Sequence, residues 1–144
     1  MKRNIFFLMC FICIFSNMAC KTTSSFSADD LSEFMDLAKT LSIVDFTFGK
    51  KYDKDSSQLK LFKVNYDTSD IEEFYFSISG FPLIRSRIDS VEKRKSEIFI
   101  KFKTTPSGWC KGIVYMLKED EYLRKRAEVF IELEENLFYF EGKS

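Results

Sequence analysis

The alternation of apolar and other side chains with a period of two is the feature that most limits what this chain can fold into. It is clearest from Ser96 to Lys103, where Ile98, Ile100 and Phe102 point one way and the residues between them point the other. Such alternation is typical of a strand with two distinct faces. The same pattern predicts seven further strands, at 42–48, 58–66, 72–79, 82–88, 109–117, 128–134 and 137–141.

The pattern also assigns an apolar face to individual strands. That face is expected to hold Phe62, Val64 and Tyr66 in segment 58–66, and Phe74, Phe76 and Ile78 in segment 72–79. Residues 118–127 fit either a short helix or a charged hairpin, and the sequence leaves both open.

One segment ahead of the strands, residues 27–41, follows the helical period instead. Ser27 is a suitable N-cap, with Asp30 three residues later. We expect this helix to cover one face or edge of a sheet, and a partner-binding helix is the alternative. Its apolar face comprises Leu31, Phe34, Met35, Leu37, Ala38 and Leu41.

One helix followed by short, locally connected strands predicts an α+β fold that is mainly β. We expect an N-terminal helix and an antiparallel sheet of about eight short strands, curled into a sandwich or a partial barrel. The globular domain should span residues 29–144, which is long enough for a single core.

The start of the chain has the layout of a secretory signal peptide. Lys2 and Arg3 precede an apolar run over 5–15, which is shorter than the roughly 20 apolar residues that a membrane-spanning helix needs. Ala19 supplies the small residue after which cleavage is expected, so residues 1–19 would be removed and Cys20 would begin the mature chain.

The segment "SNMAC" around this cysteine resembles the lipobox of bacterial lipoproteins. Ala19 and Cys20 match the pattern, whereas Asn17 and Met18 depart from it in the way that is typical of spirochaete lipoproteins. The resemblance covers only the first 28 residues, and it implies that the sulfur of Cys20 carries diacylglycerol in an outer membrane. Residues 20–28 are polar and hydroxyl-rich, so we expect a flexible tether. A disulfide between Cys20 and Cys110 is the alternative use of that thiol.

The composition argues against several kinds of function. There is no His, which excludes Ser–His–Asp and Cys–His catalytic groups and makes a zinc site improbable. Loss of residues 1–19 leaves 20 basic and 22 acidic side chains, a balance that does not suit nucleic acid binding. No enzyme activity, cofactor or metal is therefore expected. The segment from Asp53 departs from a calcium loop because Gln58 and Val64 stand where Gly and Glu are required.

Three other groups of residues each have a functional and a structural interpretation. Glu132 and Glu134 share one predicted strand face, and a solvated face is favoured over the carboxylate pair of a glycosidase. Residues 85–95 carry five basic and two acidic side chains, and a charged loop is favoured over contact with anionic lipid headgroups or glycans. Cys110 is expected to be a buried, inert thiol.

We expect a protein that is held at the envelope membrane and acts by contact with an envelope or host protein. Tyr75 and Phe99 are the candidate contact residues, because each lies opposite the apolar face of its predicted strand. The alternative is that both residues are buried on a second covered face of the sheet. A carrier of an apolar ligand in a curled sheet and a carboxylate-dependent hydrolase are further alternatives. The oligomeric state and the side of the membrane stay open.

Overall fold

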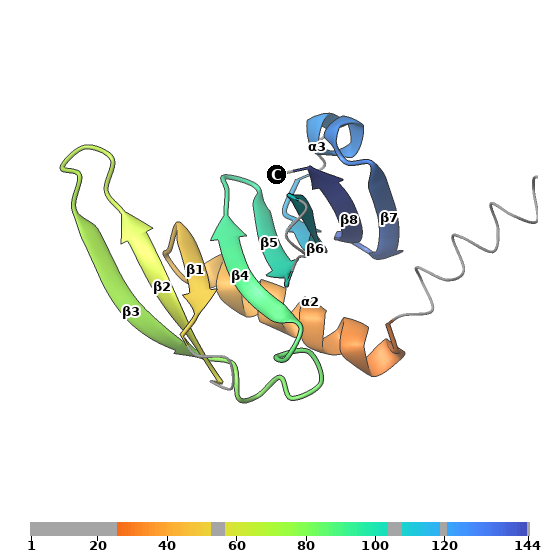
Figure 1. Ribbon diagram of the computed structural model, residues 1–144, viewed down its shortest axis with the longest axis horizontal. Helices are drawn as coiled ribbons and strands as arrows, with labels where there is room; N and C mark the ends of the chain where they lie inside the picture. Colours follow the sequence, from red (N-terminus) through yellow and green to blue (C-terminus); the bar gives the residue numbers. More distant parts are fainter. Residues whose placement is uncertain (1–25, 53–56, 104–107, 119–120, 144) are drawn as a thin grey trace, which may run out of the picture.

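The fold was obtained as a computed structural model that describes residues 26–52, 57–103, 108–118 and 121–143. It contains two helices and eight strands within these ranges (Figure 1). In chain order they are α2 (Ala28–Ile43), β1 (Phe48–Lys51), β2 (Gln58–Val64), β3 (Ile71–Ser77), β4 (Ile88–Lys93), β5 (Glu97–Phe102), β6 (Trp109–Met116), α3 (Glu121–Arg126), β7 (Val129–Glu134) and β8 (Leu137–Lys143).

The eight strands form one antiparallel sheet in the order β3-β2-β1-β4-β5-β6-β8-β7. The predicted α+β, mainly β fold with an N-terminal helix and about eight strands is confirmed. The sheet is a single layer that does not close into a barrel, so β3 and β7 are its two edges. Figure 1 shows the strands side by side, with α2 running across one face. We call the face under α2 the inner face and the opposite one the outer face.

Helix α2 begins with the predicted capping box. The amide of Asp30 donates to Ser27 Oγ at 3.1 Å, and the amide of Ser27 donates to Asp30 Oδ2 at 3.0 Å. These bonds satisfy two of the amides that a helix start leaves without a partner. One side of the helix is fully buried against the sheet, and burial of each large apolar side chain contributes about 1.5–3 kcal/mol. Its buried residues are Phe34, Leu37, Ala38 and Leu41.

The end of α2 differs from the sequence-based prediction. The helix continues to Ile43, and β1 begins only at Phe48, so the strand predicted at 42–48 was wrong. The ammonium of Lys93 donates to the carbonyls of Ser42 and Val44 at 2.7 and 2.6 Å. A cation is favourable at a helix C-terminus, where carbonyl groups lack helical partners. This stabilising group comes from β4, far along the chain, and the local pattern gives no sign of it.

The inner face holds the main core beneath α2. Leu59 and Leu61 of β2 point into it, whereas the predicted apolar face of this strand lies on the outer side, with Phe62 and Val64 half-buried and Tyr66 exposed. Phe74, Phe76 and Ile78 pack on this core as predicted. The other large side chains in it come from β4, β5, β6 and β8 and from the segments that flank α2 and β4: Phe26, Phe46, Ile84, Ile88, Val91, Ile98, Ile100, Phe102, Ile113, Leu137 and Tyr139.

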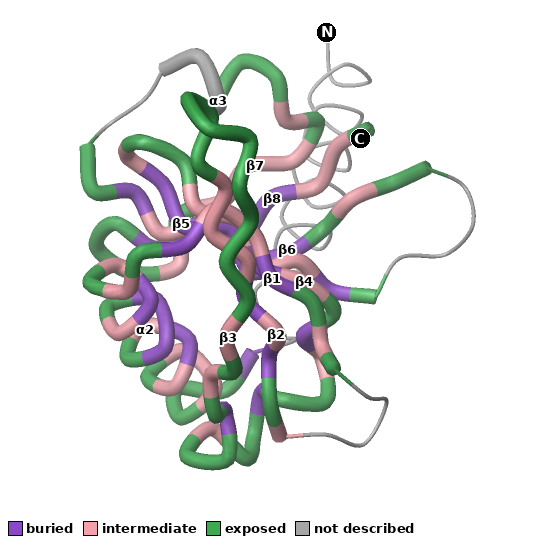
Figure 2. Tube along the Cα trace, turned by 90° about the vertical axis from the view of Figure 1, so that its left-hand side faces the viewer, coloured by how far each residue is buried: buried purple, intermediate pink, exposed green. Residues whose placement is uncertain are grey.

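The outer face is covered over only part of the sheet. Over β5, β6 and β8 it carries a second buried cluster, formed by Phe99, Val114, Met116, Phe138 and Phe140. Over β1, β2 and β3, which we call the wing, several large side chains on this face are exposed instead. Figure 2 shows β3 almost entirely exposed, whereas β5 and β8 contain many buried residues.

The segment around residues 82–93 also departs from the predictions. Residues 82–87 form turns rather than a strand: the amide of Arg85 donates to the carbonyl of Phe81 and that of Arg87 to Ile84. Pro82 fits such a turn, because proline cannot donate a ladder hydrogen bond. The expected charged loop at 85–95 is largely strand β4, paired between β1 and β5. Residues 121–126 are helical, which settles the choice left open for this region.

The folded part begins earlier than residue 29. Phe26 is buried, and its ring lies 5.8 Å from that of Phe34, while Ser27 caps α2. Residues 26–28 therefore belong to the domain and not to the predicted tether. The predicted signal peptide, Ala19 and Cys20 all lie outside the described residues.

Candidate contact surface on the outer wing

Tyr75 lies where the sequence places it, on the outer side of β3, and 54% of it is exposed. The ring of Tyr52 stands edge-on to it, with the centroids 5.2 Å apart and an interplanar angle of 87°. Tyr52 is 60% exposed. Two tyrosines that support each other and remain accessible offer a large, rigid surface to a partner.

Charged side chains border this tyrosine pair. Lys60 is the direct neighbour of Tyr75 across the strands, and its ammonium lies 2.6 Å from Glu73 Oε2. The hydrogen bond with Glu73 raises the pKa of Lys60 above its ordinary value, so the amine stays protonated. The surface therefore presents aromatic, cationic and anionic groups within two adjacent strands.

An aromatic stack continues the surface toward the centre of the sheet. Phe48 and Phe62 face each other across β1 and β2 with a centroid distance of 4.7 Å and an interplanar angle of 17°. Ile71, at the other end of β3, is 59% exposed. We define the outer wing surface as the outer side of β1–β3, centred on Tyr52 and Tyr75.

Strand β3 also exposes a backbone edge. It is the last strand on this side of the sheet, and β2 is its one strand partner in the part of the chain that the structure describes. An edge strand offers amide and carbonyl groups with which an extended segment of another chain can pair.

The second predicted contact residue, Phe99, is not on this surface. Its exposed fraction is 3%, because its ring packs edge-on against Phe140 and the guanidinium of Arg94 lies 4.6 Å from its centroid. The prediction of Phe99 as a contact residue was therefore wrong, and the alternative of burial holds. Both faces of β5 are covered, which alternation within β5 alone does not reveal.

The remaining candidate residues are dispersed. Glu132 and Glu134 are exposed on the edge strand β7, which agrees with a solvated face. Cys110 is a free, half-buried thiol, and burial raises its pKa, which disfavours the reactive thiolate. The segment from Asp53 to Ser56 lies outside the described residues.

The basic residues of segment 85–95 do not form one patch either. Lys93 binds the end of α2, and Arg94 donates to Glu92 at 2.8 Å. Lys101 donates to the second oxygen of Glu92 at 2.6 Å. Burial alone would raise the pKa of Glu92, but these two hydrogen bonds lower it below its ordinary value.

Sequence reasoning missed Tyr52, Lys60 and Glu73 as members of the surface. Tyr52 falls between the strands predicted at 42–48 and 58–66, although it continues the alternation of Phe48 and Lys50. Extending the period of two past Gly49 would have placed it beside the strand.

Comparisons with protein-family models, with curated protein sequences and with solved structures found no match. In the described ranges, no group of three or more acidic or cysteine side chains is placed to hold a metal ion. Among the same residues, neither helix has the length and apolar character needed to cross a bilayer.

Proposed function

We propose that this protein is a lipid-anchored envelope protein that acts by binding another protein through the outer wing surface. The observation that carries the proposal is the exposed pair of Tyr52 and Tyr75 beside the backbone edge of β3. Tyrosine is enriched among the residues that dominate binding energy at interfaces. The partner is inferred to offer an extended segment that pairs with β3 while its side chains contact the tyrosines.

The anchor strengthens this proposal in physical terms. Acylation of Cys20 would confine the domain to a membrane surface, and confinement raises the effective concentration of a partner in the same envelope. A surface of a few exposed side chains is then sufficient, because the contact need not be tight in solution. This part of the proposal depends on the residues around Cys20 in the sequence.

The contact is tested by chemical crosslinking on intact cells. We expect crosslinking to capture a discrete partner with the unaltered chain, and Tyr75→Ala to reduce the yield at least severalfold without unfolding the domain. Glu132→Ala is the matched control, since Glu132 is an exposed residue on the opposite edge strand. Equal yields from the two variants would refute the proposed surface.

The anchor is tested separately with a fatty-acid probe. Cys20→Ala should abolish labelling and shift the domain into the soluble fraction. Labelling that persists in this variant would contradict acylation at Cys20, without bearing on the wing surface.

The carrier alternative makes a different prediction. The described part of the molecule has hollows of about 280 and 470 Å³, both open at the surface. If the chain purified without detergent carries an apolar molecule, detected by native mass spectrometry, the carrier function replaces the contact function.

A further inference from the structure

We propose that a pocket at the N-terminal end of α2 binds the phosphate of an anionic lipid headgroup. This cationic pocket has a volume of about 280 Å³. That is slightly below the range of about 300–1,000 Å³ that is typical of sites for drug-sized ligands, so the pocket suits a smaller group. Its floor is formed by Phe26, Phe102 and Tyr139, and its rim by Arg87, Lys103 and Lys111.

The floor is a rigid aromatic cluster. The ring centroid of Phe26 lies 6.1 Å from that of Phe102 and 5.8 Å from that of Tyr139. All three residues are buried, and they come from the residue before the helix cap, from β5 and from β8. Because the floor is tied into the main core, the pocket keeps its shape without a ligand.

The rim brings together cations from three separate segments of the chain. Arg87 precedes β4, Lys103 follows β5 and Lys111 lies in β6. The guanidinium of Arg87 lies 5.2 Å from the ring centroid of Phe26, which holds it at the pocket. No carboxylate occurs among the described lining residues. Three converging cations are a suitable setting for a phosphate.

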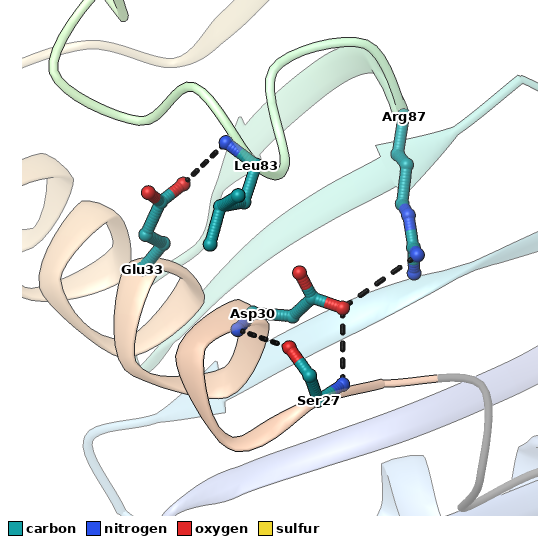
Figure 3. Close-up of polar contacts among 5 residues, drawn as sticks. All are labelled: Ser27, Asp30, Glu33, Leu83 and Arg87. Atoms are coloured by element: carbon teal, nitrogen blue, oxygen red, sulfur yellow. Dashed lines mark hydrogen bonds and ion pairs between the residues drawn. The ribbon is translucent and has the colours of Figure 1, made fainter.

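Two carboxylates close to the pocket are already engaged. Asp30 Oδ2 accepts the amide of Ser27, and Arg87 Nη2 lies 3.6 Å from the same oxygen (Figure 3). Glu141 accepts a hydrogen bond from the hydroxyl of Tyr139 and faces Lys111 across the strands. Asp30 orients Arg87, both carboxylates reduce the positive charge near the pocket, and Lys103 and Lys111 are exposed at its rim.

The position of the pocket relative to Cys20 identifies the source of the phosphate. Phe26 is six residues after Cys20, and six residues span at most about 20 Å. An acylated Cys20 would thus hold the pocket close to the headgroups, so the inference rests on the proposed anchor. Trp109 supports this orientation: it lies two residues before Lys111 on the same face of β6 and is 36% exposed. Tryptophan is favoured at the interface between membrane and water.

The test uses the mature chain with Cys20→Ala, so that acylation plays no part. A failure of the pocket proposal can then be distinguished from a failure of the proposed anchor. We expect this chain to sediment with vesicles of phosphatidylglycerol and phosphatidylcholine in equal parts, but not with phosphatidylcholine alone. Lys103→Gln combined with Lys111→Gln should reduce binding roughly 25-fold, from about fivefold for each lysine near an anionic surface.

The matched control is Lys39→Gln combined with Lys118→Gln, which removes the same charge from exposed positions that do not line the pocket. It should reduce binding less than twofold. Equal losses from the two double variants would overturn the proposal, as would the absence of binding by the Cys20→Ala chain that keeps all its lysines. If inorganic phosphate at the concentration of the vesicle lipid displaces the chain from the vesicles, the lipid source is refuted, because the site would then recognise free phosphate equally well.

Discussion

The outer face of the sheet is covered at one end and exposed at the other. Over β5, β6 and β8 the outer side chains form a buried cluster, whereas over the wing they remain accessible to solvent. Strands in both regions alternate with the same period, and Tyr75 and Phe99 occupy equivalent positions in that pattern. Alternation therefore shows which residues share a face of a strand, whereas long-range packing decides whether that face is covered.

The largest expected effect is a difference in the free energy of unfolding between variants of Phe99 and Tyr75. Phe99→Ala should lower the free energy of unfolding by about 3–5 kcal/mol, because it removes a buried ring and leaves a cavity. Tyr75→Ala should change it by about 0.5 kcal/mol or less, as is usual for exposed positions. Urea unfolding of both variants measures the difference. Equal destabilisation would show that the outer face is not divided as described.

The glycines provide a second comparison. A Cβ atom at Gly112 would lie 2.1 Å from the backbone oxygen of Ile100, which cannot move without disturbing β5. We expect Gly112→Ala to cost about 3 kcal/mol, as severe overpacking does. Gly80, in the turn after β3, has nothing within 4 Å of the same point. Gly80→Ala should be neutral or slightly stabilising, and a cost similar to that of Gly112→Ala would contradict the packing in β6.

Substitution of Lys93 tests the contact between β4 and the C-terminal end of α2. Its two hydrogen bonds to carbonyls at the end of α2 are charge-assisted, and loss of such bonds should cost about 2 kcal/mol. Lys93→Met keeps most of the aliphatic chain while removing the ammonium. Lys95→Met, at an exposed position two residues later, should have little effect in the same thermal unfolding experiment. If both variants lose the same stability, the contact with α2 contributes nothing.

Glu92 gives the smallest predicted effect and a dependence on pH. The pKa of Glu92 is lowered in the folded state from its ordinary value of 4.5. Its ion pairs therefore stabilise the fold above pH 4.5, and this contribution is lost as the pH falls through the folded pKa. Partial exposure limits the effect to about 1 kcal/mol. Unfolding of Glu92→Gln should differ from that of the unaltered chain at pH 7 and converge with it in acid. A difference that persists at low pH would exclude the ion pairs as its cause.

Sequence reasoning succeeded where the determining contacts are local. The helix cap at Ser27, the alternation in β5 and the break between the strands predicted at 128–134 and 137–141 are all set by neighbouring residues. It was wrong at 42–48 and 82–88, where Lys93 and the turn hydrogen bonds decide the outcome. The candidate surface was found in part, since Tyr75 is exposed but its partner Tyr52 comes from another strand end.

The cationic pocket was out of reach for a related reason. Its rim draws Arg87, Lys103 and Lys111 from three segments whose proximity depends on the strand order. Arg87 belongs to segment 85–95, which was interpreted as a charged loop, and nothing in the sequence spacing distinguishes Lys103 and Lys111 from the other lysines.

Thiol labelling at matched positions on the outer face tests the central claim most directly. Tyr75→Cys and Val114→Cys are placed singly in the mature chain with Cys20→Ala and Cys110→Ser, so that each has one thiol. In the purified chain we predict rapid maleimide labelling at position 75 and protection at position 114, where the native side chain is fully buried. In cells, with Cys20 retained and blocked by acylation, position 75 should become protected by the partner. The division of the outer face would be contradicted by protection of position 75 in the purified chain, or by equal labelling of the two positions. The role of position 75 in the contact surface would be contradicted if its labelling were unchanged in cells.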